Sequence, residues 1–258
     1  MDLSLTNRTA LVAGSSRGIG KAIALALLQE GCRVCITGRD SASLQDAEVS
    51  LHASVPGAHI LPFSGDMSDA AVITEAVIAI ESRWGAPDIL IANLGTGSGK
   101  PGWQQDESEW ERLFNLNFFA SVRLAQAVIP AIQRNGGGSI VFISSITGIE
   151  ATPAPLPYSA SKAALINYSK NLARVVAPLN IRVNCIAPGN VLFPGGSWEK
   201  HLANRREQVE KYIQTEVPQQ RFGTPEEIAA LAVFLCSPQA AFATGSCYVM
   251  DGGQTRTL

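Results

Sequence analysis

Short apolar runs alternate with longer segments of helical periodicity along nearly the whole chain. Runs rich in Val, Ile and Leu are typical of buried strands, and helices between them favour parallel strands joined by crossovers. We predict an α/β fold with a doubly wound parallel sheet of about seven strands, helices on both faces, and a single domain over residues 1–258. The predicted strands are residues 9–13, 33–37, 59–63, 88–92, 139–144, 180–186 and 246–250. The predicted helices are residues 19–29, 41–52, 68–84, 106–135, 158–176, 197–215 and 225–235, with Pro130 marking a break or kink.

Charge and hydropathy exclude several kinds of partner. The formal net charge is -2, so the chain has no electrostatic reason to bind nucleic acid or an anionic membrane. Apolar residues make up 46% of the chain, which is ample for a buried core. No apolar run reaches the roughly 18 residues of a membrane span. The first residues lack a basic region followed by an apolar stretch, so we expect no secretory signal and a cytoplasmic location.

The five cysteines are spread over the chain, and two of them have CxxC spacing. Cys32 and Cys35 lie in a β-branched run that reads as a strand, where residues three apart point to opposite faces. That arrangement suits neither a disulfide nor a shared metal, so we expect reduced, structural thiols. The histidines form no cluster with metal-ligand spacing, and we expect no metal site.

A glycine-rich turn connects the first predicted strand to the helix that follows it. Gly14, Gly18 and Gly20 lie in this turn. Glycine lets the backbone approach a pyrophosphate, which then rests on the N-terminus of the helix. The spacing differs from GxGxxG, and the turn alone is also compatible with a purely structural role.

Tyr158 and Lys162 are four residues apart at the start of a predicted helix, so both side chains lie on one face. An ammonium near a phenol favours the phenolate and lowers the phenol pKa toward the working pH. The pair is therefore a candidate proton donor and acceptor. The alternative is an ordinary helix face with a half-buried tyrosine and a solvated lysine.

Further motifs accompany these two at characteristic intervals. They are residues 12–20, 91–95, 181–184 with 188–189, 221–226 and 250–253, together with Asn117 and Ser145. In this order they resemble the TGxxxGxG turn, the NNAG segment, the catalytic asparagine and serine, YxxxK and the C-terminal signatures of the short-chain dehydrogenase/reductase family. The resemblance covers essentially the whole chain, implies a Rossmann-type fold, and is closest to the 3-oxoacyl-thioester reductase branch.

The resemblance implies a role for each catalytic candidate. Tyr158 would protonate a carbonyl oxygen as hydride reaches its carbon, and Ser145 would hydrogen-bond that oxygen. Lys162 would hold the nicotinamide ribose and lower the phenol pKa. Asn117 would maintain a helix irregularity and a proton-relay water. The cofactor residues that the resemblance implies are Gly14, Ser16, Arg17, Gly18, Ile19, Gly20, Arg39, Asp66, Met67, Asn93, Gly95, Tyr158, Lys162, Pro188, Gly189 and Val191.

The second strand indicates which cofactor is used. NAD-preferring relatives end this strand with an acidic residue, whereas here Gly38 and Arg39 follow it. Arg39 and Arg17 would suit a 2′-phosphate, so we predict NADP(H), with NAD(H) as the alternative. Asp40 is a competing partner for Arg39.

Three positions depart from the family pattern: Ala13 replaces a threonine, Leu94 an alanine and Phe193 a threonine. A lid at about residues 190–216 would cover the substrate, with an apolar face and a basic, solvated face. Carrier-protein reductases usually have an arginine where this chain has Leu179, which argues against a dedicated fatty-acid-cycle role. The candidate substrate residues are Leu94, Thr147, Glu150, Phe193 and Trp198, with a surface ion pair as the alternative for Glu150.

The predicted function is an NADP(H)-dependent oxidoreductase that interconverts a ketone or 3-oxoacyl carbonyl with a secondary alcohol. The alternatives are an NAD-dependent secondary alcohol dehydrogenase and, from another class, a non-catalytic nucleotide-binding sensor or scaffold. We expect a small-molecule substrate. The resemblance further implies a homotetramer, or a dimer, built through the helices near residues 106–135 and 158–176.

Overall fold

The computed structural model describes residues 2–100 and 102–257 and has seven parallel strands in one sheet. Their order across the sheet is β3-β2-β1-β4-β5-β6-β7. The strands are β1 (Thr9–Ala13), β2 (Arg33–Gly38), β3 (His59–Ser64), β4 (Ile89–Ala92), β5 (Gly138–Ile143), β6 (Ile181–Pro188) and β7 (Cys247–Met250). The order reverses between β1 and β4, which is where open α/β sheets bind ligands.

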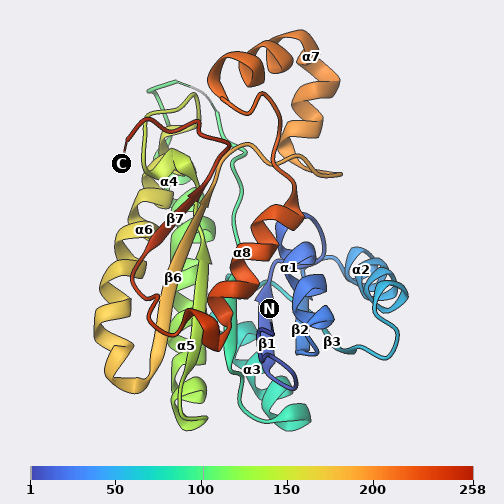
Figure 1. The fold of residues 1–258 in the computed structure, drawn as a ribbon. Coiled ribbons are helices and arrows are strands. Elements are labelled where there is room, and N and C mark those ends of the chain that lie inside the picture. Colours follow the sequence, from blue (N-terminus) through green and yellow to red (C-terminus); the bar gives the residue numbers. More distant parts are fainter. Residues whose placement is uncertain (1, 101, 258) are drawn as a thin grey trace.

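Helices cover both faces of the sheet, as predicted (Figure 1). One face packs against α1 (Gly18–Gln29), α2 (Ser41–Ser54) and α8 (Pro225–Cys236). The other packs against α3 (Ala70–Trp84), α5 (Ala120–Arg134) and α6 (Leu156–Val176). Two further helices are α4 (Glu107–Phe114) and α7 (Ser197–Glu216), and short 3-10 turns occur at Ile146–Gly148, Ala177–Leu179 and Pro238–Ala240. The doubly wound α/β fold is therefore confirmed.

The long helical region predicted over residues 106–135 is interrupted, but not at its proline. A π-helical turn, Asn115–Phe119, separates α4 from α5, whereas Pro130 lies inside α5, which continues to Arg134. π-helical turns inside α-helices are frequently found at functional sites. The irregularity coincides with Asn117, where the family resemblance had implied one.

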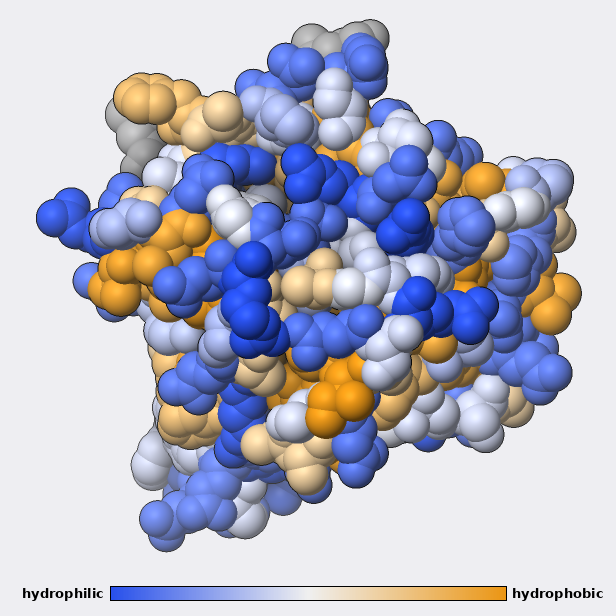
Figure 2. Space-filling model, turned by 90° about the horizontal axis from the view of Figure 1, so that it is seen from below, coloured by the Kyte–Doolittle hydropathy of each residue, from blue (hydrophilic) through white to orange (hydrophobic). Residues whose placement is uncertain are grey.

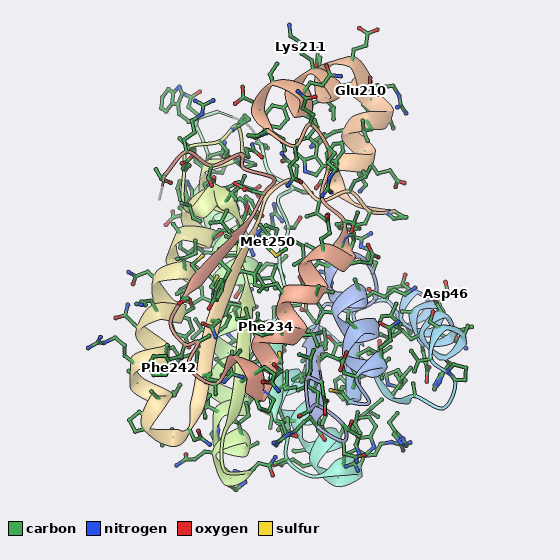
Figure 3. The ribbon with its side chains drawn as sticks, in the orientation of Figure 1. Asp46, Glu210, Lys211, Phe234, Phe242 and Met250 are labelled. Atoms are coloured by element: carbon green, nitrogen blue, oxygen red, sulfur yellow. The ribbon has the colours of Figure 1, made fainter. Side chains whose placement is uncertain are left out.

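The helix α7 lies beyond the carboxyl end of β6 (Figure 1). Val209 and Ile213 are buried, whereas the charged residues of its other face are exposed. Glu210 and Lys211 point outward from its far end (Figure 3). Non-helical dihedral angles at Arg205 divide the helix at a kink.

The thiols occupy the positions that the strand pattern predicts. Cys32 packs in the core on one face of the sheet and Cys35 in the core on the other, and both are free. Burial raises the pKa of each thiol to about 12. They are therefore inert, neutral side chains at physiological pH.

The surface seen from below in Figure 2 is mostly hydrophilic, with apolar residues in separate patches. Within the described residues, none of the helices combines the length and the apolar character that a membrane span requires. Nor do these residues contain a group of three or more His, Cys, Asp and Glu side chains suited to a metal ion.

Candidate active site

A cleft of about 550 Å³ opens where the strand order reverses. Its floor is formed by the segments that follow β1, β2, β4 and β5, and α6 and the start of α7 provide further walls. Eleven predicted cofactor residues line it: Gly14, Ser16, Arg17, Ile19, Arg39, Asp66, Met67, Asn93, Gly95, Tyr158 and Lys162. Its volume lies within the usual range of small-molecule and cofactor pockets.

The glycine turn is held by hydrogen bonds to the end of β2. The backbone N–H of Gly14 donates to Thr37 Oγ1 over 3.1 Å, and the N–H of Thr37 donates to Ser15 Oγ over 2.8 Å. Asn93 Nδ2 donates to the Gly14 carbonyl over 3.1 Å, which ties the turn to the segment after β4. Ala13 has no hydroxyl with which to tie the turn to its neighbours. The bonds of Asn93 and Thr37 tie it instead.

The turn leaves room and donors for an anion. Gly14 and Gly18 have positive φ, and no side chain caps the N-terminus of α1. A Cβ at Gly20 would lie 2.2 Å from the Gly14 carbonyl oxygen, so only glycine permits this close turn. Free N–H groups at a helix N-terminus and a backbone without side chains fit a pyrophosphate. The residues present therefore fit a dinucleotide cofactor.

The part of the cleft beside the glycine turn and the end of β2, which we call the adenosine end, carries two arginines, one in each of these segments. Arg17 and Arg39 both line it, and neither belongs to an ion pair among the described residues. The Asp40 carboxylate instead caps α2, accepting from the backbone N–H of Ser43 over 2.8 Å and from its hydroxyl over 2.6 Å. The competing pair between Asp40 and Arg39 is therefore not formed.

The predicted catalytic residues converge from three elements. Tyr158 and Lys162 extend from α6 into the cleft, with Lys162 Nζ 5.9 Å from the centre of the phenol ring. Lys162 Nζ donates to the Ile143 carbonyl over 2.9 Å, at the end of β5. Ser145 follows the same strand and lies near the Tyr158 phenol, whose pKa its hydroxyl lowers.

Asn117 lies behind the cleft and holds the segment after β4. Its Oδ1 accepts from the Thr96 N–H over 2.8 Å, and its Nδ2 donates to the carbonyls of Thr96 and Leu113 over 3.2 and 2.9 Å. The side chain is completely buried, with all its polar atoms bonded. Gly95 fits beside it because a Cβ there would lie 2.5 Å from Asn117 Oδ1 and 3.1 Å from Lys162 Nζ.

The pKa values of the central pair differ from the sequence-based expectation. Burial raises the pKa of Tyr158, while its hydrogen bond with Ser145 acts in the opposite direction. Burial lowers the pKa of Lys162 to about 8. Lys162 is not among the groups that shift the phenol pKa in this structure, where burial acts most strongly.

Only part of the predicted substrate set lines the cleft. Leu94 and Phe193 do, and the Phe193 ring lies over Gly18, where a Cβ would be 2.6 Å from it. Trp198 packs inside the lid, stacked on Tyr212 with ring centres 5.8 Å apart. Thr147 lies on the 3-10 turn after Ser145, outside the cleft lining.

Glu150 also lies outside the cleft lining and binds the C-terminal segment. One carboxylate oxygen accepts from the backbone N–H of Arg256 over 2.6 Å and from that of Thr257. These bonds lower the pKa of Glu150. Neither a cationic substrate nor an ion pair is needed to explain this residue, because two backbone donors already satisfy the charge.

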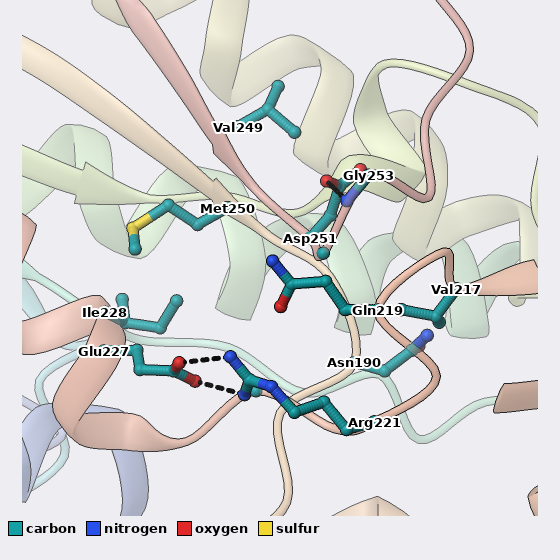
Figure 4. A pocket seen from close by; sticks show the side chains of 12 residues that line it. Asn190, Val217, Gln219, Arg221, Glu227, Ile228, Val249, Met250, Asp251 and Gly253 are labelled. Atoms are coloured by element: carbon teal, nitrogen blue, oxygen red, sulfur yellow. Dashed lines mark hydrogen bonds and ion pairs between the residues drawn. The ribbon is translucent and has the colours of Figure 1, made fainter. Parts of the chain in front are cut away.

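Pro188, Gly189 and Val191 do not line the cleft. Asn190, which lies between the last two, lines a second hollow of about 330 Å³ (Figure 4). Val191 pairs with Gly223 in a short parallel bridge. In this hollow the Arg221 guanidinium donates two hydrogen bonds to Glu227, of 2.6 and 2.9 Å. This pair lowers the pKa of Glu227 to about 2. The charges of Arg221 and Glu227 neutralise each other, and Asp251, which also lines the hollow, accepts from the backbone N–H groups of Gly253 and Thr255.

Several cleft residues were not foreseen from the sequence. They are Thr37, Thr96, Gly97, Ser98, Arg112, Leu116 and Lys200. Residues 96–98 belong to the segment after β4, and their position near the carboxyl end of a parallel strand was the available signal. Arg112 and Lys200 come from helices whose approach to the cleft no local pattern encodes.

Comparisons with known proteins agree with this geometry. A family model described as enoyl-(acyl carrier protein) reductase matches residues 13–255. The dehydrogenase/reductase SDR family member 4 of Rattus norvegicus is 33% identical over 98% of this chain and 89% of its own length. The 3-oxoacyl-[acyl-carrier-protein] reductase FabG of Thermotoga maritima is 34% identical over 97% of this chain and 99% of its own.

A solved structure extends the likeness to three dimensions. The L-sorbose reductase of Gluconobacter frateurii, in complex with NADPH and L-sorbose, superposes with a TM-score of 0.92. The two proteins are 34% identical, and the match covers 100% of both chains. The protein therefore belongs to the short-chain dehydrogenase/reductase family of oxidoreductases.

Proposed function

We propose that this protein is an NADP(H)-dependent reductase that interconverts a ketone or 3-oxoacyl carbonyl with a secondary alcohol. The observation that carries the proposal is the convergence of Tyr158, Lys162 and the glycine turn on one cleft, with Ser145 near the phenol. A bound nicotinamide supplies the hydride. The chain supplies the proton and the surroundings in which the charge on the carbonyl oxygen is neutralised.

Each catalytic side chain has a task that its position supports. Tyr158 donates the phenol proton to the carbonyl oxygen in reduction and takes it back in oxidation. Ser145 orients the phenol and hydrogen-bonds the same oxygen. Lys162, held by the Ile143 carbonyl, binds the nicotinamide ribose hydroxyls. Asn117 keeps the segment after β4 in place through its two bonds to Thr96.

Arg17 and Arg39 support the choice of NADP(H). Both guanidinium groups line the adenosine end, lack a carboxylate partner in the described structure, and suit a 2′-phosphate. The related L-sorbose reductase was solved with NADPH. The residues proposed to hold the cofactor include Gly14, Ser16, Asp66 and Met67.

The proposal is tested by steady-state rates with NADPH and NADH on a panel of ketones and 3-oxoacyl thioesters. We expect kcat/KM with NADPH to exceed that with NADH by about 10- to 100-fold. Equal or better use of NADH would favour the NAD-dependent alcohol dehydrogenase instead. Cofactor binding without turnover of any carbonyl would favour the non-catalytic sensor.

Assembly into a homotetramer, or a dimer, is part of the same proposal. Exposed apolar side chains lie on the helices through which such an assembly would form, including Phe119 at 46% and Val175 at 72% exposure. Burying them against a second copy would remove apolar area from water. Light scattering should therefore give a mass of two or four chains, and the mass of one chain would refute this.

A further inference from the structure

The segment after β4 faces the Tyr158 ring and is held at two points. At the first, Asn117 bonds both backbone groups of Thr96. At the second, Arg112 Nη2 donates to the Ser98 carbonyl over 2.8 Å. Between them, the N–H of Ser98 donates to Thr96 Oγ1 over 3.1 Å, which closes a tight turn around Gly97. We call residues 95–99 the facing loop.

Arg112 is itself fixed by Glu109, one turn earlier on α4. Its Nε and Nη2 donate to the two carboxylate oxygens of Glu109, each over 2.8 Å. The pair lowers the pKa of Glu109 and raises that of Arg112, so both groups stay charged near neutral pH. Because Glu109 already neutralises Arg112, the guanidinium positions the loop and does not act as a receptor for an anionic substrate.

Gly97 lies directly against the end of the Tyr158 ring that bears the hydroxyl. A Cβ at this position would be 3.7 Å from Cζ and 3.8 Å from Cε1 of Tyr158, which is ordinary contact. Gly97 is not among the glycines with positive φ, so its backbone accepts an alanine. The missing side chain leaves space beside the group that is proposed to protonate the substrate.

We propose that the facing loop is the wall that sets substrate size, with Gly97 as its specificity-determining residue and Arg112 as its positioning residue. This inference rests on the proposed ketone reduction. A ketone whose oxygen meets Tyr158 must place one of its two substituents against this wall. Filling the space at Gly97 therefore excludes branched substituents, whereas releasing the Ser98 carbonyl lets the wall move away from them.

The substitutions Gly97→Ala and Arg112→Ala should change the selectivity for compact over branched ketones in opposite directions. In Gly97→Ala, the ratio of kcat/KM for compact ketones to that for branched ketones should rise about fivefold or more. In Arg112→Ala, the KM for compact ketones should rise about fivefold with kcat little changed, and the same ratio should fall. The Kd for NADPH, followed by fluorescence, should be unchanged in both variants.

Lys100→Ala is the matched control. Lys100 also pairs with an acidic residue near α4, Asp106 at 3.5 Å, but both side chains are 75% exposed. The variant removes a neighbouring cation without touching the bonds of Ser98, so its selectivity should equal that of the wild type. Selectivity ratios that stay unchanged, or that move in the same direction in Gly97→Ala and Arg112→Ala, would overturn the inference.

Hydrogen exchange separates this inference from the proposed function. In the cofactor-free protein, the Thr96 and Ser98 amides should lose protection in Arg112→Ala and keep it in Lys100→Ala and Gly97→Ala. Unchanged exchange in Arg112→Ala overturns the positioning role, whatever the activity. A wild type that reduces no carbonyl refutes the proposed function, while the exchange result still decides whether Arg112 holds the loop.

Discussion

At the adenosine end of the cleft the backbone forms the site, whereas at the reacting end side chains from distant segments hold it. The turn after β1 depends on positive φ at Gly14 and Gly18 and on an uncapped helix N-terminus. The reacting end depends on Asn117, on the pair of Arg112 with Glu109, and on a C-terminal segment that links Glu150 to the lid.

That C-terminal segment shows how far apart the partners lie along the chain. Gln254 Nε2 donates to the Tyr212 hydroxyl of α7 over 2.7 Å, and Asn190 Nδ2 donates to Gln254 Oε1 over 2.6 Å. The segment therefore joins the lid to the chain just after β6. A site formed by the backbone needs particular residue types in a fixed order, but a site formed by side chains needs only geometry. The first kind is readable in a sequence, whereas the second is readable only where its side chains belong to a local pattern or a known motif, as Tyr158 and Lys162 do.

The largest effect is expected at the reacting end, from Tyr158→Phe. Removal of the proposed proton donor should lower kcat by about 10³-fold, because general acid–base catalysis contributes on this scale. NADPH binding, measured by fluorescence titration, should be retained, since the adenosine end is formed separately.

Tyr168→Phe is the control for that variant, because Tyr168 lies on the same helix but packs against Phe118 and Phe142. It should keep normal kcat. Full activity of Tyr158→Phe would remove the residue from the proposed mechanism.

At the adenosine end, the double variant Arg17→Ala with Arg39→Ala should lower the preference for NADPH over NADH by about 10- to 100-fold. The physical reason is the loss of charge-assisted hydrogen bonds to the 2′-phosphate. The measurement is kcat/KM with each cofactor. Arg33→Ala, at the opposite end of β2, should keep the preference, and an unchanged ratio in the double variant would contradict the assignment.

The backbone character of the adenosine end is tested by Gly18→Ala against Gly57→Ala. Both positions have positive φ, so each alanine costs about 1–2 kcal/mol of folding free energy. Only at Gly18 would the Cβ also meet another group, the Phe193 ring at 2.6 Å, whereas Gly57 has nothing within 4 Å.

Chemical denaturation should therefore show a larger loss for Gly18→Ala, by about 1 kcal/mol or more. Adding Phe193→Ala should recover this excess. Equal losses in the two single variants would mean that the ring and the turn are not in contact.

The last prediction concerns how stability changes with pH through Lys162. Burial places its pKa at about 8 in the folded protein, below the ordinary value of 10.5. Between these values the unfolded chain binds more protons than the folded one, so this residue makes stability rise with pH. Compared with Lys162→Met, the wild type should gain about 1–3 kcal/mol of unfolding free energy between pH 8 and pH 10.

The comparison with Lys162→Met cancels the contributions of the buried thiols and of Tyr158, which both proteins share to a first approximation. Denaturation curves at several pH values provide the measurement. A difference between the two proteins that stays flat or decreases over this range would contradict a buried, proton-releasing Lys162.

The sequence by itself determined the fold and the backbone part of the site. Period and length of the apolar runs predicted all seven strands to within two residues of their bounds at each end. Glycine spacing located the turn after β1, and the helical repeat put Tyr158 and Lys162 on one face. These features are local, so the order of residues is enough to specify them.

Only the tertiary structure decided which side chains face the cleft. Three predicted substrate residues, Trp198, Thr147 and Glu150, are near the site along the chain but do not line the cleft. Trp198 packs inside the lid, Thr147 lies on a 3-10 turn, and Glu150 binds the C-terminal segment. Arg112, which no sequence pattern singled out, reaches the facing loop from α4 and donates to the Ser98 carbonyl. The direction of a side chain depends on how elements that are distant in sequence pack together. The same packing buries Tyr158, and this burial raises its pKa.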